Sequence, residues 1–252
     1  MKKIKQIVTI FAALALAVTA GLSFAGTKTK AAGSDEFTRT AIEIAADMGY
    51  GWNLGNTMEA TNTWTSNPKV TDFETAWGQP VTTKAMIDGI KKAGFNSIRI
   101  PVSWSNMMSS DGNYIIDASY FKRVDEIISY AFANDMYVII NDHYDGGWWE
   151  HFCGNKRDCM KHYKNMWTQV AGHYKDYSEK LIFESANEEL GDSLKKSLSK
   201  IDVNISDTAL YNLVNEINQT FVDIVRQSGG NNARRYLLIA GFNTDIDKTC
   251  SS

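Results

Sequence analysis

The feature that most limits the possible folds of this chain is a regular alternation of short apolar runs with long amphipathic segments. Five runs are strand-like, at residues 48–54, 96–101, 136–142, 181–188 and 235–242. Between them, apolar residues recur at helical spacing in residues 82–93, 119–134, 159–174 and 207–228. Strict alternation of strand and helix predicts right-handed βαβ units and a parallel sheet. No stretch typical of a domain linker interrupts the series.

Two parallel architectures are compatible with this alternation: an open doubly wound sheet and a closed (β/α)8 barrel. A dinucleotide-binding open sheet needs a glycine-rich turn after its first strand, but residues 53–56 read Asn-Leu-Gly-Asn, and the sequence has no phosphate-binding loop motif. Polar and aromatic residues instead follow the C-terminal end of each strand: Asn53, Trp104, His143, Asn187, Glu188 and Asn243. Barrel enzymes build their sites at that end. The sequence therefore predicts an α/β fold of the (β/α)8, or TIM, barrel type.

The spacing of the strands predicts that only part of a barrel is present. Tyr50, Ser97, Val138, Phe183 and Leu237 mark the five strands and lie 47, 41, 45 and 54 residues apart. Eight strands at that spacing need roughly a hundred or more additional residues, since a complete barrel takes about 250 after any leader is removed. We therefore expect a barrel truncated after about five strands, with an exposed sheet edge after the fifth. The other interpretation is that the chain has a different architecture.

The start of the chain has the pattern of a secretory signal peptide. Three lysines precede an uncharged, mostly apolar segment at residues 7–20, and residues 23–25 offer a small-x-small cleavage site, with residues 31–32 as a second candidate. An uncleaved membrane anchor is the alternative, although the apolar stretch is barely long enough. We therefore expect secretion, with residues 1–32 as signal peptide, residues 33–252 as one folded part and no membrane association after cleavage.

Charge and cysteine content narrow the class of protein further. The 26 Lys and Arg against 29 Asp and Glu give a net charge of −3, and no basic run follows the first five residues, which argues against a nucleic-acid partner. In an oxidising compartment, the spacing of Cys153 and Cys159 is compatible with a local disulfide, which leaves Cys250 over. A zinc site would need more ligands than His151 and His162 readily add, so no metal is expected.

A carboxylate inside the fourth strand and another at its end are the strongest chemical signal. Glu184 and Glu188 lie four residues apart, or roughly 13 Å along an extended strand. Catalytic carboxyl pairs lie about 5–5.5 Å apart in retaining enzymes and about 6.5–9.5 Å apart in inverting ones, so these two are not such a pair. We interpret Glu184 as a structural carboxylate. Arg99 is flanked by isoleucines that face the helices, so it should point into the barrel and pair with a carboxylate.

Histidines and tryptophans supply the remaining candidates. His143 ends the third strand, where a histidine typically hydrogen-bonds a substrate; a satisfied core histidine is the alternative. His151, His162 and His173 lie at loop or helical positions and are expected to face solvent. Flat rings with polar edges suit stacking on sugars, so the tryptophans together favour a carbohydrate groove, although packing explains each one alone better. Those at strand ends and βα-loops are Trp52, Trp64, Trp77, Trp104, Trp148 and Trp149.

Four segments then occur in a recognisable order. They are residues 51–57 (GWNLGNT), 95–104 (FNSIRIPVSW), 138–143 (VIINDH) and 181–188 (LIFESANE). Together they closely resemble glycoside hydrolase family 5, and within it the clostridial-type secreted cellulases, which are endo-β-1,4-glucanases. Further similarity to that group lies in residues 70–80 and 236–249. The resemblance covers essentially everything after the leader.

The resemblance implies a retaining glycoside hydrolase that works without metal or other cofactor and cuts internal β-1,4 bonds of cellulose or related β-glucans. Residues 33–252 would be the N-terminal part of its catalytic barrel. By correspondence, Glu188 is the general acid/base and Asn187 contacts the sugar 2-hydroxyl. Arg99 would orient the nucleophile, and His143 would line the glycone side of the cleavage point. The other substrate-binding candidates are Asn53, Trp52, Trp104 and Trp148.

The chain departs from the family pattern in three places. The usual Asn-Glu-Pro is Asn187-Glu188-Glu189, and the frequent His-His pair is His143-Tyr144. The family's nucleophile glutamate belongs to the seventh strand and its substrate-binding His and Tyr to the sixth, and this chain has neither segment. We therefore expect the nucleophile to be absent and the chain on its own to be inactive.

Several alternatives stay open at this point. A β-mannanase or xyloglucanase of the same family is one, because loop aromatics select the backbone sugar. A non-catalytic carbohydrate-binding protein that keeps the groove is another. The main interpretation predicts a β-glucan polysaccharide as partner, and a dockerin or carbohydrate-binding module beyond Ser252 is compatible with it. The missing phosphate loops disfavour a nucleotide-binding sheet protein.

Overall fold

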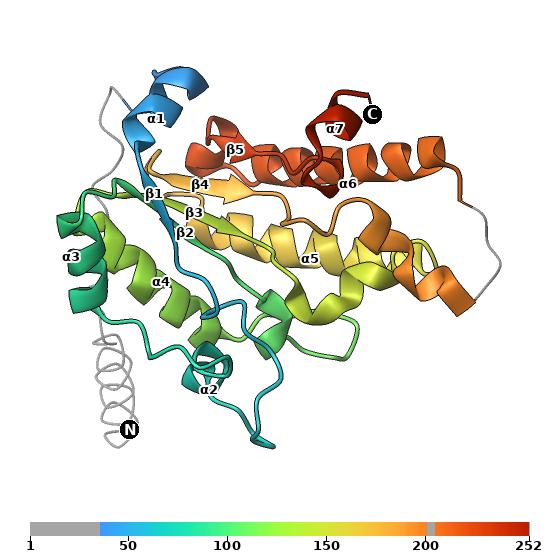
Figure 1. The fold of residues 1–252 in the computed structure, drawn as a ribbon, viewed down its shortest axis with the longest axis horizontal. Coiled ribbons are helices and arrows are strands. Elements are labelled where there is room, and N and C mark those ends of the chain that lie inside the picture. Colours follow the sequence, from blue (N-terminus) through green and yellow to red (C-terminus); the bar gives the residue numbers. More distant parts are fainter. Residues whose placement is uncertain (1–35, 201–204, 252) are drawn as a thin grey trace, which may run out of the picture. The chain divides into compact units, whose positions relative to one another are not determined.

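The computed structural model of the chain describes residues 36–200 and 205–251, built around one parallel sheet in the order β1-β2-β3-β4-β5 (Figure 1). The predicted signal peptide lies outside the described residues. All five strands fall within the predicted segments, and their order in the sheet is their order in the chain. They are β1 (Gly51–Asn53), β2 (Ser97–Ile100), β3 (Tyr137–Asn141), β4 (Leu181–Glu184) and β5 (Leu237–Leu238).

Four long helices connect successive strands, as the amphipathic patterns predicted. They are α3 (Lys84–Lys92), α4 (Ala118–Phe132), α5 (Lys156–Tyr174) and α6 (Asp207–Gln227). The predicted start of α6 is confirmed, because the Ser206 side chain accepts a hydrogen bond from the backbone N–H of Ala209. The shorter elements are α1 (Ala41–Met48), α2 (Val70–Glu74), α7 (Ile246–Ser251) and the 3-10 turns η1 (Trp104–Met107), η2 (Asp145–His151), η3 (Asp192–Lys200), η4 (Gly230–Ala233) and η5 (Phe242–Thr244).

The strand register separates two sets of side chains. Ile98, Val138 and Leu181 are aligned across β2, β3 and β4 and are buried with the apolar faces of the helices. Arg99 is aligned with Ile139 one residue further on, so both lie on the opposite face of the sheet. Arg99 therefore points away from the helical layer, as the flanking isoleucines predicted.

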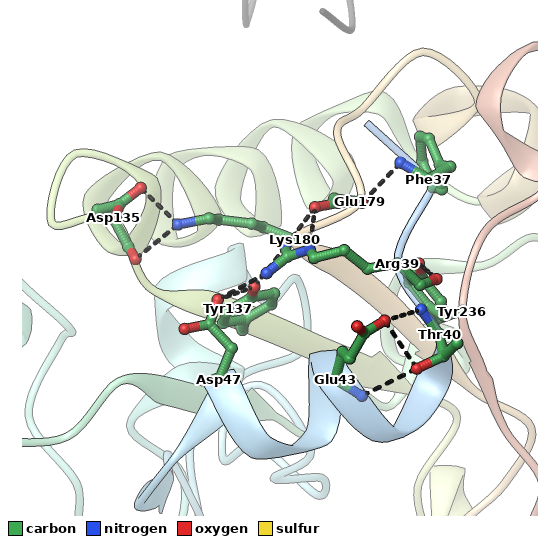
Figure 2. Close-up of polar contacts among 10 residues, drawn as sticks. All are labelled: Phe37, Arg39, Thr40, Glu43, Asp47, Asp135, Tyr137, Glu179, Lys180 and Tyr236. Atoms are coloured by element: carbon green, nitrogen blue, oxygen red, sulfur yellow. Dashed lines mark hydrogen bonds and ion pairs between the residues drawn. The ribbon is translucent and has the colours of Figure 1, made fainter. Parts of the chain in front are cut away.

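The segment before α1 is attached to the N-terminal ends of three strands (Figure 2). The Arg39 guanidinium forms ion pairs with Glu179 and Asp47 and donates to the Tyr137 hydroxyl at 2.7 Å. The Tyr236 hydroxyl donates in turn to the backbone carbonyl of Arg39. Tyr137 begins β3, Glu179 lies two residues before β4, and Tyr236 directly precedes β5. Arg39 therefore links these strands at the N-terminal end of the sheet.

Both edges of the sheet are open within the described residues. β1 pairs with β2 alone, and β5 pairs with β4 alone. Leu238 and Ile239, in and after β5, are 43 % and 49 % exposed. This is the exposed edge that was predicted after the fifth strand. None of the described helices is both long and apolar enough to cross a bilayer.

The disulfide that the cysteine spacing suggested is not formed. Cys153, Cys159 and Cys250 are all free thiols. Cys159 lies in the first turns of α5, which begins at Lys156, three residues before the predicted helical segment. Burial raises the pKa of the Cys159 thiol to about 11, which keeps it protonated at neutral pH.

Candidate active site

One guanidinium organises the C-terminal end of the sheet. Arg99 in β2 donates from Nε and Nη2 to the two carboxylate oxygens of Glu184, at 2.7 and 3.2 Å. Its Nη1 donates to Asn53 Oδ1 at 3.0 Å, and its Nη2 also donates to Asn187 Oδ1 at 2.9 Å. The planar fork of arginine matches the carboxylate in this two-point contact. Arg99 thereby joins the ends of β1, β2 and β4 and brings three predicted residues together.

Glu184 has the structural role that was predicted for it. Its carboxylate is held by Arg99, and the two side chains are only 17 % and 22 % exposed. β4 ends at Glu184, and the backbone then bends. The bend brings Asn187 to the same side as Arg99, whereas strict strand alternation would put it on the opposite face.

Glu188 is exposed to solvent immediately after the residue that Arg99 holds. Asn187 is fixed at three points: its backbone N–H donates to the Asp142 carbonyl at 3.1 Å, its Oδ1 accepts from Arg99, and its Nδ2 lies 3.4 Å from Glu189 Oε1. The peptide that carries Glu188 is therefore held in place while its carboxyl stays accessible to a ligand. This is the geometry expected of a proton donor at the mouth of a barrel.

Glu189 is buried, which its sequence position beside the predicted acid did not indicate. Its residue surface is 6 % exposed, and no described group donates to its Oε2. Burial raises the pKa of Glu189 to about 7, and the neighbouring Glu188 acts in the same direction, against the opposing effects of Asn187 and Arg99. The structure therefore places a carboxyl that titrates near neutral pH directly beside the site.

His143 lies at the end of β3, half-buried and on the same side as Arg99. The amide Nδ2 of Asn141 lies 3.4 Å from His143 Nδ1, and Asn141 Oδ1 accepts from the backbone N–H of Val102 at 3.2 Å. This orientation of the amide assigns the imidazole proton to Nε2. Burial, and then the charge of Arg99, lowers the pKa of His143 to about 4. The imidazole is therefore neutral near pH 7, with an N–H available to a ligand.

Two of the predicted stacking tryptophans do not present a ring to this surface. Trp104 is fully buried, and its Nε1 donates to the carbonyl of Asn141 at 2.9 Å. Trp52 is aligned with Ile98, on the helical side of the sheet, and packs edge-to-face on Phe95 at 5.4 Å between ring centroids. Neither ring is available for stacking on a substrate. Trp104 is enclosed, and strand alternation directs Asn53 to the face that carries Arg99 and Trp52 to the helical face.

The third predicted stacking residue, Trp148, is enclosed by other rings. Trp149 and His162 are each stacked on it, with ring centroids 4.3 Å away. Two rings at that distance on the same face would overlap each other, so they cover opposite faces of the indole. The Trp148 Nε1 donates to Asp145 at 2.8 Å. Trp148 therefore offers its edge, and not an open face, to a sugar.

His162 is buried, contrary to the expectation that it faces solvent. It is 8 % exposed, is stacked on Tyr114 at 4.4 Å between ring centroids, and has its Nε2 3.1 Å from Ser105 Oγ. Burial lowers its pKa to about 4. The sequence held a signal for this position, since residues 159, 162, 163 and 166 form one buried stripe of α5.

Three exposed rings remain as stacking candidates on loops that follow strands. Trp77, after α2, is 42 % exposed, and its Nε1 donates to the carbonyl of Thr61 at 3.1 Å. Trp64, on the loop between β1 and α2, is 95 % exposed. Tyr144 directly follows His143 and is also exposed. Tyr144 stands where the family resemblance gives a histidine, and sequence reasoning noted it only as a departure. An exposed aromatic ring beside a polar site suits contact with a sugar face.

This arrangement agrees with a known family of hydrolases. The sequence matches the family described as Cellulase (glycosyl hydrolase family 5) over residues 58–251. The chain belongs to glycosyl hydrolase family 5. The resemblance read from the four motifs is thereby confirmed.

Several members of family 5 are similar to this chain over part of their own length. Endoglucanase A of Paenibacillus barcinonensis is 42 % identical over 244 residues, which are 94 % of this chain and 57 % of that protein. The solved GH5-4 broad specificity endoglucanase from Ruminococcus champanellensis with bound cellotriose is 38 % identical, with a TM-score of 0.75 over 86 % of this chain and 62 % of its own. The solved family 5 xyloglucanase from Paenibacillus pabuli is 42 % identical, with a TM-score of 0.68 over 81 % of this chain and 54 % of its own.

The chain thus spans 54–62 % of the length of these three family 5 proteins. Its fold is that of their (β/α)8 barrel, of which the described residues contain five consecutive strands. A doubly wound sheet reverses its strand order at a switch point, whereas the order here runs from β1 to β5 without reversal. The prediction of a barrel in place of an open sheet is therefore confirmed.

Beneath the aromatic rings, this family 5 chain holds a pair of buried carboxyls. Asp145 accepts from the backbone N–H and the hydroxyl of Ser105, at 2.7 and 2.6 Å, and from Trp148. Asp142 is fully buried, and no described group donates to either of its oxygens. Burial, and then the charge of Asp145, raises the pKa of Asp142 well above its usual range. This raised pKa favours the protonated form of the Asp142 carboxyl over its carboxylate.

Replacing Asp142 by asparagine should therefore stabilise the protein at neutral and alkaline pH. The unfolded chain releases the Asp142 proton near the usual pKa of 3.8, whereas burial raises the pKa of Asp142 well above that value in the folded chain. Between the pKa of Asp142 in the unfolded chain and its pKa in the folded chain, each unit of rising pH lowers the free energy of unfolding by about 1.4 kcal/mol. An amide has nearly the same shape but cannot ionise, so it removes this cost.

Urea unfolding followed by tryptophan fluorescence at a series of pH values checks this expectation. We expect Asp142→Asn to raise the free energy of unfolding by about 1–3 kcal/mol at pH 8. The gain should shrink as the pH falls towards the usual aspartate pKa. The exposed Asp176→Asn serves as the matched control and should show no such trend. A variant less stable than the wild type at pH 8 would show that Asp142 is ionised in the folded protein.

Proposed function

We propose that this chain carries the acid/base part of the active site of a retaining endo-β-1,4-glucanase that cuts internal bonds of cellulose or related β-glucans. The observation that carries the proposal is the exposed Glu188 beside Asn187, whose amide oxygen is held by Arg99. The relatives reported above, two endoglucanases and a xyloglucanase, support a β-1,4-linked glucan backbone as the substrate.

Each of these side chains has a chemical role in the proposed reaction. Glu188 protonates the glycosidic oxygen as the bond breaks and later takes a proton from the attacking water. Asn187 contacts a sugar hydroxyl, and the neutral His143 donates from Nε2 on the glycone side. Arg99 neutralises Glu184 and supplies positive potential that keeps a nearby nucleophilic carboxylate ionised.

The described carboxylates near Glu188 do not supply the second catalytic carboxyl. Retaining hydrolysis needs one about 5–5.5 Å from the acid. Glu184 is held by Arg99, and Asp142 and Glu189 are buried. We therefore expect the purified chain to bind cellotetraose but to release no reducing sugar from carboxymethylcellulose.

Calorimetric titration and a reducing-sugar assay check the two halves of this expectation. Maltotetraose, with the same sugar in α-linkage, is the matched control ligand and should not bind. Measurable sugar release that Glu188→Gln abolishes would show that the chain supplies its own nucleophile. A folded chain that does not bind cellotetraose would contradict the proposed site.

Xyloglucan is the second candidate substrate, because the Paenibacillus pabuli relative is a xyloglucanase. Xyloglucan has the same β-1,4-glucan backbone with xylose branches, so both substrates present the same bond to Glu188. Titration with a xyloglucan oligosaccharide and with mannotetraose, beside cellotetraose, separates a xyloglucanase and a mannanase from a cellulase. Secretion through residues 1–32 and an attached dockerin or binding module are also part of the proposal, on sequence grounds alone.

A further inference from the structure

The buried carboxyl of Glu189 has no function in the mechanism above. It lies directly after the proposed acid, with 6 % of its surface exposed, and its Oε2 has no donor among the described residues. A buried carboxylate oxygen without a donor is costly, so such a position needs a physical explanation. The contact that its other oxygen makes supplies one.

Glu189 Oε1 faces the amide nitrogen of Asn187 at 3.4 Å. The orientation of that amide is set from its other side, because Arg99 Nη2 donates to Asn187 Oδ1 at 2.9 Å and can only bond an acceptor. With the oxygen turned to Arg99, the NH2 group of Asn187 must turn towards Glu189. The long Nδ2–Oε1 distance is that of a weak contact, which a change of charge on Glu189 can strengthen or release.

We propose that Glu189 is a positioning residue that holds the Asn187 NH2 group when it is ionised and releases it when it is protonated. A carboxylate accepts from an N–H about twice as strongly as a neutral carboxyl does. Protonation also gives the buried carboxyl an O–H group, which is itself a donor and does not accept from the Asn187 NH2 group.

The ionisable groups around Glu189 come from three elements. Glu188 on the same loop opposes ionisation of Glu189, while Arg99 in β2 favours it. Asp142, at the end of β3, has a raised pKa that favours its own neutral form. Burial is the largest influence, and the resulting pKa of about 7 puts the change within the physiological range. The nearby histidines, His143 and His162, have pKa values lowered to about 4 and do not titrate there.

The consequence for ligands rests on the proposed function, in which Asn187 contacts a sugar hydroxyl. Below the pKa of Glu189, the Asn187 NH2 group is free to donate to that hydroxyl. Above it, the group is held back by the carboxylate. Sugar binding should therefore strengthen as the pH falls through neutrality.

Nuclear magnetic resonance of the whole chain tests the positioning role without any sugar. The side-chain amide signals of Asn187, identified with Asn187→Asp, should shift between about pH 5 and 9 with a midpoint near the pKa of Glu189. The carboxyl carbon of Glu189 should titrate with the same midpoint. In Glu189→Gln, which keeps the shape but not the charge, the shift of the Asn187 signals should be lost.

Asp142→Asn is the matched control, because it removes the other carboxyl next to Glu189 whose pKa is raised. The Asn187 titration should persist in it. The proposal is overturned if the Asn187 signals do not move with pH or if they move equally in Glu189→Gln. It is also overturned if their midpoint differs from that of the Glu189 carboxyl carbon, a comparison that needs no variant. The proposal is likewise overturned if the Asn187 titration disappears in Asp142→Asn and persists in Glu189→Gln.

Calorimetric titration with cellotetraose then separates this role from the proposed function. The dissociation constant of the wild type should fall about threefold from above to below the midpoint, as expected for one neutral hydrogen bond. That of Glu189→Gln should be independent of pH over this range. If the resonance titration is present but cellotetraose does not bind at any pH, the proposed function is wrong while the positioning role of Glu189 holds.

Discussion

Replacing Glu188 by glutamine is expected to lower kcat/KM on carboxymethylcellulose by about 10²–10⁴-fold, the usual contribution of a positioned general acid. The assay uses a chimera that joins this chain to the remaining C-terminal part of Endoglucanase A of Paenibacillus barcinonensis, which is 42 % identical to it over the shared part. Glutamine has the shape of the glutamate side chain but cannot give a proton to the glycosidic oxygen. Binding should therefore persist while the chemical step is lost.

The leaving group makes this test specific for acid catalysis. A dinitrophenyl β-cellobioside needs no protonation of its leaving oxygen, so kcat/KM for this substrate should be nearly unchanged by Glu188→Gln. Glu216→Gln, which makes the same chemical change on the exposed side of α6, is the matched control and should leave both substrates unaffected. Equal losses on both substrates in Glu188→Gln would show that Glu188 is not the acid.

Replacing Arg235 by leucine is expected to lower the free energy of unfolding by about 3–5 kcal/mol, at the upper end of the range for single substitutions. Arg235 directly precedes Tyr236 and β5 and is fully buried. Burial lowers its pKa to about 9, so the guanidinium is still charged at neutral pH. Its hydrogen bonds, at 2.6–3.0 Å, go to Asn232 Oδ1 and to the carbonyls of Tyr174, Tyr177, Ser178 and Leu181.

The loss arises because leucine leaves these acceptors buried without donors, and each such acceptor costs about 1–3 kcal/mol before relaxation. The neighbouring Arg234 is exposed, so Arg234→Leu is the matched control and should change stability by no more than about 0.5 kcal/mol. Urea unfolding followed by far-ultraviolet circular dichroism measures both variants. Equal stability of the two would show that the buried network around Arg235 does not hold the end of α5 to β4 and β5.

The sequence predicts those features of the protein that depend on residues close together in the chain. The period of the apolar pattern gave the alternation of strands and helices, and the in-and-out alternation of β2 directed Arg99 to the face of the sheet that carries the site. Glu184 could be recognised as structural because strand geometry alone separates it from Glu188 by too great a distance for a catalytic pair. The start of α6 at Asp207, where the predicted helical segment begins, is another local feature of this kind.

The errors concern contacts between segments far apart in the chain. Trp148 sits on a βα-loop, as expected, but its two faces are covered by Trp149 and by His162 of α5. Trp104 is enclosed in the same way, with its N–H bonded to the end of β3. Composition correctly indicated many rings near the strand ends, but which of them meet each other depends on how the loops fold back on α5.

The sequence by itself thus determined the parallel α/β fold, the family and the position of the predicted acid at the end of β4, because periodicity and short motifs are local properties. Only the tertiary structure decided which rings are open to a ligand, that burial raises the pKa of Asp142, and that Glu189 is buried against Asn187. Burial and pKa depend on what surrounds a side chain in three dimensions, and those surroundings come from strands and helices that are dozens of residues apart.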